Sequence, residues 1–152
     1  MPRRLILKTI DRFWKARLAG DKDALHGFLA PKATYEMVGA KAFARSTMVG
    51  PAPAGPAADR LLDDFKFHSL EQVTAVVRGR KAAVVNKFQV SFRDGAPEAT
   101  EGCDLWEFDE DGKVTSLRQF VDTDLVRRMI VGGAPKPRRA KAPPVTRHAP
   151  SA

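Results

Sequence analysis

The sequence predicts an α+β fold, with N-terminal helices packed against a curved, mainly antiparallel sheet. Two observations carry this prediction. Apolar residues recur at helical spacing near the N-terminus, and from Phe67 onward the period of the apolar pattern changes to two. Stretches of turn-forming residues separate the later segments at short intervals. Helices first and antiparallel strands afterwards are typical of an α+β domain.

Three helices and a short strand are expected before the main part of the sheet. Leu5–Leu18 has the apolar spacing of a helix, and Gly20 can end it. A second helix, capped by Asp21, should run to about Leu29 and be closed by Pro31.

Thr34–Val38 then has the composition of a strand, whereas residues 39–56 show no clear pattern and become rich in Gly and Pro. Pro56 can begin a third helix that runs through Asp64.

Four strands should follow in succession and form a meander. They are Phe67–Arg78, Ala82–Arg93, Glu98–Phe108 and Lys113–Asp122. The segments between them have the residues of tight hairpin turns. A last short helix, capped by Thr123 or Asp124, should end near Ile130.

The composition is that of a soluble globular protein with one domain. Of the 152 residues, 43% are hydrophobic and 29% are charged, which is ordinary for this class. No apolar run approaches the length that spans a membrane, so we expect no membrane partner. The single cysteine, Cys103, cannot form an internal disulfide, which fits a reducing, cytoplasmic location.

Most of the excess positive charge lies at the C-terminal end. The net charge is +8, and residues 132–152 hold five basic and no acidic side chains. We expect these Pro-, Ala- and Arg-rich residues to form a disordered tail after a domain that spans residues 1–131. The domain itself is only mildly basic, so nucleic-acid binding is the least favoured function and would involve the tail alone.

One carboxyl lies in the otherwise mostly apolar hairpin Gly102–Val114. If Asp104 faces inward, its charge must be neutralised or paired. Burial would then raise its pKa, and the neutral acid could donate a hydrogen bond to a ligand carbonyl or move a proton. The alternative is a carboxylate satisfied by a backbone amide or a basic neighbour. The sequence leaves both open.

Three stretches together resemble the ketosteroid-isomerase and SnoaL-like branch of the nuclear-transport-factor-2-like fold. They are Ala19–Leu25, like the family's join between its first two helices; Ala33–Glu36, like its first strand; and Asp104–Val114, like its third hairpin. The resemblance covers roughly residues 5–130. It implies a sheet closed against helices into a cone with an apolar pocket, and a homodimer formed through the sheet.

The resemblance also places known catalytic positions on residues that lack the required chemistry. The hairpin Asp of the steroid isomerases falls on Asp104, but their Tyr falls on Phe13 and their base on Met37. A phenylalanine cannot donate a hydrogen bond, and a methionine cannot take a proton. The related limonene epoxide hydrolases have a catalytic Asp where this chain has Gln119, and an amide cannot act as a general base. Both mechanisms are therefore disfavoured.

The candidate site follows from these positions and from strand parity. Tyr35 shares a strand face with Met37, whereas Glu36 would point the same way only if a bulge reversed the strand. Asp104 is the candidate acid, and the expected ligand-binding residues are Phe13, Trp14, Tyr35, Met37, Trp106, Gln119 and Val121. Tyr35 and Trp106 could equally be core residues, and Gln119 a rim residue. Parity does not decide which face of residues 82–93 looks inward.

No metal or other cofactor is expected. His26, His68 and His148 do not have metal-ligand spacing with one another or with Cys103. Cys103 should face away from its neighbour Asp104 and be a small buried thiol.

The predicted function is a SnoaL-like pocket protein for a small, largely apolar carbonyl compound. Any reaction would be an isomerase-, cyclase- or lyase-like proton transfer at Asp104. The alternative is a non-catalytic, dimeric ligand-binding or scaffold domain, in which Phe13, Trp14, Met37 and Trp106 fill the pocket. The sequence does not decide whether the protein is an enzyme.

Overall fold

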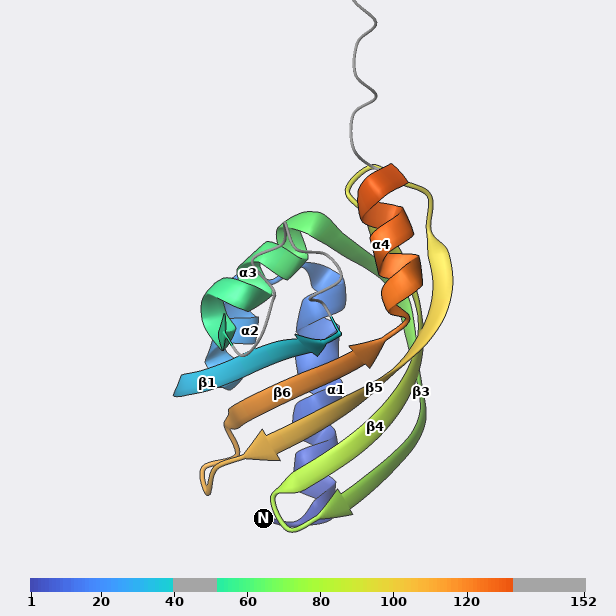
Figure 1. Cartoon of the computed structure of the whole chain (residues 1–152). Coiled ribbons are helices and arrows are strands. Elements are labelled where there is room, and N and C mark those ends of the chain that lie inside the picture. Colours follow the sequence, from blue (N-terminus) through green and yellow to red (C-terminus); the bar gives the residue numbers. More distant parts are fainter. Residues whose placement is uncertain (40–51, 133–152) are drawn as a thin grey trace, which may run out of the picture.

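The helices and strands build one curved sheet with helices on its concave side (Figure 1). The structure, a computed structural model, describes residues 1–39 and 52–132. The helices are α1 (Arg3–Ala19), α2 (Lys22–Phe28), α3 (Ala54–Asp64) and α4 (Thr123–Gly132). The strands are β1 (Leu29–Val38), β2 (Ala52–Pro53), β3 (Phe65–Arg78), β4 (Lys81–Phe92), β5 (Glu98–Phe108) and β6 (Val114–Val121). The α+β class is as predicted.

The sheet has the strand order β2-β1-β6-β5-β4-β3. The strands from β3 to β6 form the predicted antiparallel meander, while β1 joins it by pairing in parallel with β6. Figure 1 shows α1 crossing one face of the sheet, α3 beside β1, and α4 at the end of the sheet where β6 finishes. The sheet and these helices therefore enclose a tapered core.

Helix α1 ends where the sequence predicts it. Gly20 has a φ of 69°, and its N–H and that of Asp21 bond to the last carbonyls of the helix. Asp21 then accepts a hydrogen bond from Ala24 N at 2.9 Å and caps α2. The two helices are thereby joined by a tight turn.

Two boundaries differ from the prediction. Helix α2 ends at Phe28, next to the predicted Leu29, but β1 begins at Leu29 instead of Thr34. Pro31 therefore lies inside β1. It falls between Leu29 and Thr34, where the register of β1 against β6 shifts, so its missing N–H interrupts no regular ladder. Helix α3 begins at Ala54, two residues before Pro56. Most of the unassigned segment (residues 40–51) and the expected tail (residues 133–152) lie outside the described residues.

The alternation of buried residues settles which side of β4 faces the core. Ala82, Val84, Asn86, Phe88 and Val90 are buried on the concave side. Lys87 and Gln89 are exposed on the other. The concave side is thus the only one the helices cover within the described chain, and it carries the core.

Aromatic side chains fill the deep part of the cone. The ring of Phe13 in α1 meets Trp106 of β5 edge-on, with centroids 5.0 Å apart, and Trp106 is fully buried. Phe108 stacks on the other side of this cluster, 6.2 Å from Trp106. Such contacts fix how α1 crosses the sheet.

Replacing Phe13 with Ala should lower the free energy of unfolding by about 3–5 kcal/mol, because a buried ring is lost and leaves a cavity. Urea unfolding followed by circular dichroism measures this. Lys15→Ala, on the exposed side of the same helix, is the matched control and should change the value by less than about 0.5 kcal/mol. Equal losses in the two variants would contradict the packing described here.

Candidate functional site

Asp104 lies on the concave face of the sheet, in the middle of β5. Its cross-strand neighbours are Val84 in β4 and Gln119 in β6. Only 3% of its surface is exposed. The sequence-based expectation that this carboxyl faces inward agrees with this placement.

Two amides hold the two carboxyl oxygens of Asp104. Asn86 Nδ2 donates to Oδ2 and Gln119 Nε2 donates to Oδ1, both at 2.9 Å. The Tyr35 hydroxyl in turn donates to Gln119 Oε1 at 2.6 Å. A buried polar network therefore links β1, β6, β5 and β4, with Tyr35 and Asn86 each one position diagonal to its partner on the next strand.

The environment of Asp104 raises its pKa from 3.8 to about 7. Loss of hydration on burial is the main cause, and it outweighs the opposing effects of the Gln119 bond, the positive charge of Arg17 and the Asn86 bond. The carboxyl can thus gain or lose a proton near neutral pH, which is the property required of a general acid or base.

Asn86 can serve either form of this carboxyl. Its Oδ1 is buried and has no hydrogen-bond partner among the described residues. Turning the amide over would present this oxygen to a protonated Asp104, which could then donate to it. The neutral acid therefore has a partner available within the network.

Arg17 is a second buried polar group beside the network, and the sequence analysis did not single it out. It lies in the last turn of α1 and is 5% exposed. Its guanidinium sits 4.4 Å from the centre of the Phe67 ring, and its Nε has no hydrogen-bond partner. Burial lowers the pKa of Arg17, while Tyr35 and Asp104 act in the opposite direction. Even so, a guanidinium keeps its charge.

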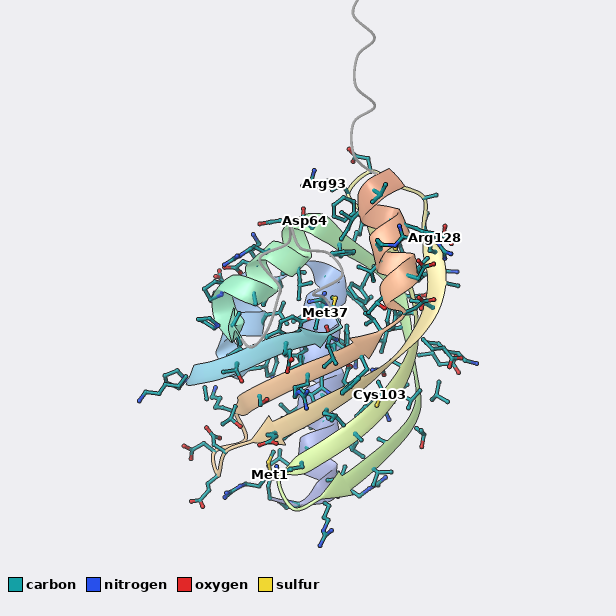
Figure 2. The ribbon with its side chains drawn as sticks, viewed as in Figure 1. Met1, Met37, Asp64, Arg93, Cys103 and Arg128 are labelled. Atoms are coloured by element: carbon teal, nitrogen blue, oxygen red, sulfur yellow. The ribbon has the colours of Figure 1, made fainter. Side chains whose placement is uncertain are left out.

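A small cavity of about 30 Å³ lies at the wide end of the cone. This is room for about one or two water molecules. Figure 2 shows Met37, one of its lining residues, in the space between α3 and α4. The lining consists of Arg17, Met37, Leu61, Phe65, Phe67, Phe88, Val90, Thr100, Gln119, Val121, Asp122, Leu125 and Val126.

The expected ligand-binding residues divide into two groups. Met37, Gln119 and Val121 line the cavity. The remainder are buried but not on its wall, and these are Phe13, Trp14, Tyr35 and Trp106. Asp104 is also absent from the wall and lies one hydrogen bond behind it, through Gln119.

Other candidates point away from the cavity. Glu36 faces the outer side of the sheet, where its carboxylate pairs with Arg118 at 2.8 Å, so no bulge turns it inward. Cys103 is partly exposed on the opposite face from Asp104, and burial raises the pKa of its thiol. Over residues 1–39 and 52–132, no cluster of His, Cys, Asp and Glu could hold a metal ion.

One signal in the sequence could have identified Arg17. It follows Ile10, Phe13 and Trp14 at helical spacing, so it occupies the apolar face of α1. A charged residue at such a position is either buried or at the rim. Asn86 shares the parity of Phe88 and could have been found once the inward face of β4 was known.

Comparison with known proteins identifies the family of this chain. The family model described as a SnoaL-like domain covers residues 10–117. The chain belongs to the SnoaL-like domain family. No curated protein matches the sequence.

Solved structures extend the comparison of this SnoaL-like domain. An LEH-like epoxide hydrolase from M. tuberculosis is 16% identical, with a TM-score of 0.63 over 85% of this chain and 89% of that one. An NTF2-like protein from Burkholderia xenovorans is 18% identical, with a TM-score of 0.64 over 85% and 98%. TerC, co-crystallised with polyporic acid, is 13% identical, with a TM-score of 0.68 over 84% and 98%. These likenesses confirm the nuclear-transport-factor-2-like fold.

The described helices of this SnoaL-like domain include none that is long and apolar enough to cross a membrane.

The raised pKa of Asp104 predicts how stability depends on pH. Because the folded-state pKa of about 7 exceeds the ordinary 3.8, the folded protein binds the proton more tightly than the unfolded chain. The stabilisation that results is fully present below about pH 4 and is lost as the pH rises to about 7. Asp104→Asn stays neutral at every pH. Its free energy of unfolding relative to that of wild type should therefore rise by about 2–4 kcal/mol between pH 4 and pH 7.

Urea unfolding at a series of pH values tests this. Glu98→Gln, at an exposed carboxyl at the start of the same strand, is the control and should not show this gain. If Asp104→Asn also follows wild type throughout, the carboxyl does not titrate as described.

Proposed function

We propose that this SnoaL-like domain binds a small, largely apolar carbonyl compound at the wide end of the cone. Asp104 would be the proton-carrying group in any isomerase-, cyclase- or lyase-like reaction there. One observation supports this most directly: a buried carboxyl with a pKa of about 7 lies one hydrogen bond behind the cavity wall. Groups with such perturbed pKa values are concentrated at functional sites.

The route from Asp104 to a ligand runs through Gln119. The Gln119 amide lines the cavity and donates to Asp104. If its side chain turns aside, a neutral Asp104 can donate directly to a carbonyl oxygen and stabilise the enol that forms. The carboxyl of the lining, Asp122, accepts the N–H groups of Asp124 and Leu125. It therefore caps α4 in place of the predicted Thr123 or Asp124.

The cavity must widen to take such a compound. Ligand sites commonly have volumes of about 300–1,000 Å³, far above the 30 Å³ found here. We propose that the cavity widens by a shift of α4 away from the sheet. Leu125 and Val126 of this helix form part of the cavity wall, and α4 is the last element of the described chain.

The second candidate is a non-catalytic, dimeric ligand-binding or scaffold domain. The specific observation in its favour is the packing of Phe13, Trp14 and Trp106 into the deep part of the cone, next to a cavity of only about 30 Å³ among the described residues. Under this proposal Asp104 and its amides fix the strand register and move no proton.

A homodimer through the outer face of the sheet forms part of either proposal. Val85, Cys103 and Phe120 are neighbours across three strands on that face, and Phe120 is 39% exposed. The ion pairs Lys81–Glu107 and Lys87–Glu101 flank this apolar row. Apolar residues rimmed by charged ones are typical of an interface. A cytoplasmic location is also proposed, on the basis of the single free cysteine.

A melting screen with apolar ketones and polyketide-like compounds tests the ligand proposal. At least one compound should raise the midpoint temperature of the wild-type protein, because a ligand that binds only the folded state stabilises it. Asp104→Leu should lose that shift, since it removes the hydrogen-bonding group.

Glu98→Gln, at an exposed position of β5 outside the cavity wall, should keep the shift and serves as the matched control. Turnover and affinity that are the same in wild type, Asp104→Asn and Asp104→Leu would remove Asp104 from any active role. A screen in which no compound shifts the wild type would favour the scaffold proposal.

Replacing Phe120 with Glu should convert the dimer to a monomer in sedimentation velocity, because it places a charge in the apolar row. Leu5→Glu, at an exposed position on α1, is the control and should leave the dimer intact. A wild-type protein that sediments as a monomer would rule out the proposed dimer.

A further inference from the structure

Arg17 stands between two hollows of the molecule. On its inner side is the small cavity beside Gln119. On its outer side is an open hollow of about 570 Å³ between the end of α1, the end of α3 and the start of β3. Arg17 belongs to the lining of both.

The charge of Arg17 lacks a direct partner within the described part of the chain. No carboxylate there lies within 4.0 Å of its guanidinium, and its buried Nε makes no hydrogen bond. The central carbon of the guanidinium lies 4.4 Å from the centre of the Phe67 ring and 5.6 Å from that of Trp14. Asp104 interacts with this positive charge only by longer-range electrostatic attraction, without a direct contact. Aromatic rings and a distant carboxyl compensate a buried cation far less than a paired anion does.

The inner side of Arg17 is the favourable one for an anion. The outer hollow holds Asp63, Asp64 and Asp94 against Lys66 and Arg93, and Figure 2 shows Asp64 and Arg93 near each other at the top of the molecule. Two of these carboxylates are already paired, Asp63 with Lys22 and Asp64 with Arg93, and water in this open hollow would screen an anion from Arg17. The inner cavity has Asp122 as its single acidic side chain, exposed and bound to the N-terminus of α4. Apart from Arg17, Thr100 and Gln119, the remaining lining is apolar.

We propose that the ligand of this site is an apolar carboxylic acid whose carboxylate binds the Arg17 guanidinium from inside the cone. Its apolar body would contact the rings of Phe67 and Phe88 and the α4 side chains Leu125 and Val126. This inference rests on the proposed function and narrows its carbonyl compound to an acid. A guanidinium suits this task because its planar N–H donors match the two oxygens of a carboxylate.

The Gln119 amide completes the recognition of such a ligand. It lies on the same cavity wall as Arg17, while its own oxygen accepts from Tyr35 and its nitrogen donates to Asp104. Arg17 therefore anchors the acid, and the network behind Gln119 faces the atoms next to the carboxylate. Arg17 acts here as a binding residue.

Matched pairs of acid and amide test the inference in isothermal titration calorimetry. The probes are phenylacetate against phenylacetamide and hexanoate against hexanamide, each pair having the same carbon skeleton. Wild type should bind each acid about tenfold or more tightly than its amide, since only the acid carries a charge for Arg17.

Two variants separate the charge from the packing of the side chain. Arg17→Met keeps a long apolar stem, and it should weaken acid binding about tenfold or more while leaving amide binding unchanged. Arg17→Lys keeps the charge and should retain part of the preference for the acid. Circular dichroism checks that both variants fold, and the comparison in wild type needs no variant.

The outcomes distinguish this inference from the function on which it rests. If the amides, or the ketones of the melting screen, bind as tightly as the acids, Arg17 does not hold a carboxylate and the pocket proposal stands. If Arg17→Met binds the acids as tightly as wild type does, Arg17 likewise does not hold the carboxylate, and the pocket proposal stands. If acids, amides and ketones all fail to bind the wild-type protein, the pocket proposal and this inference fall together.

Discussion

The structure depends on keeping one carboxyl satisfied in a place without water. Asp104 is fixed by amides from the strands on both sides of its own, and Gln119 carries the connection on to Tyr35 in β1. A slip of any of these strands by one residue would turn its polar group outward and leave the others buried without partners. The network therefore defines the register of four strands as well as the chemistry of the site.

The polar groups of the cone are divided between two depths. Asp104, Asn86 and Tyr35 lie within the core, whereas Arg17 and Gln119 reach the cavity wall. Aromatic rings occupy the space below, so the wide end under α4 is where a molecule can be accommodated. This arrangement separates the group that can exchange a proton from the group that carries a fixed charge.

The sequence predicts most of the fold because local patterns decide it. Helical spacing locates α1, and the change to period two locates β3 to β6. The start of β1 at Leu29 could not be predicted, since the tolerance of Pro31 in this strand depends on the register shift against β6, near the other end of the chain. The inward turn of Asp104 follows from parity, but its partners and the cavity do not. Helical spacing places Arg17 on the apolar face of α1, but its burial depends on the packing of that helix against β3, which the sequence does not give.

The position of β6 has a consequence for how the chain acquires this structure. This strand lies between β1 and β5, although it is the last strand in the sequence. During synthesis β1 emerges early and finds no neighbour of its final sheet except the two-residue β2 until residues 114–121 have left the ribosome. Such long-range pairing slows folding. The β3–β5 hairpins can assemble beforehand, so the arrival of β6 is the step that unites the two halves.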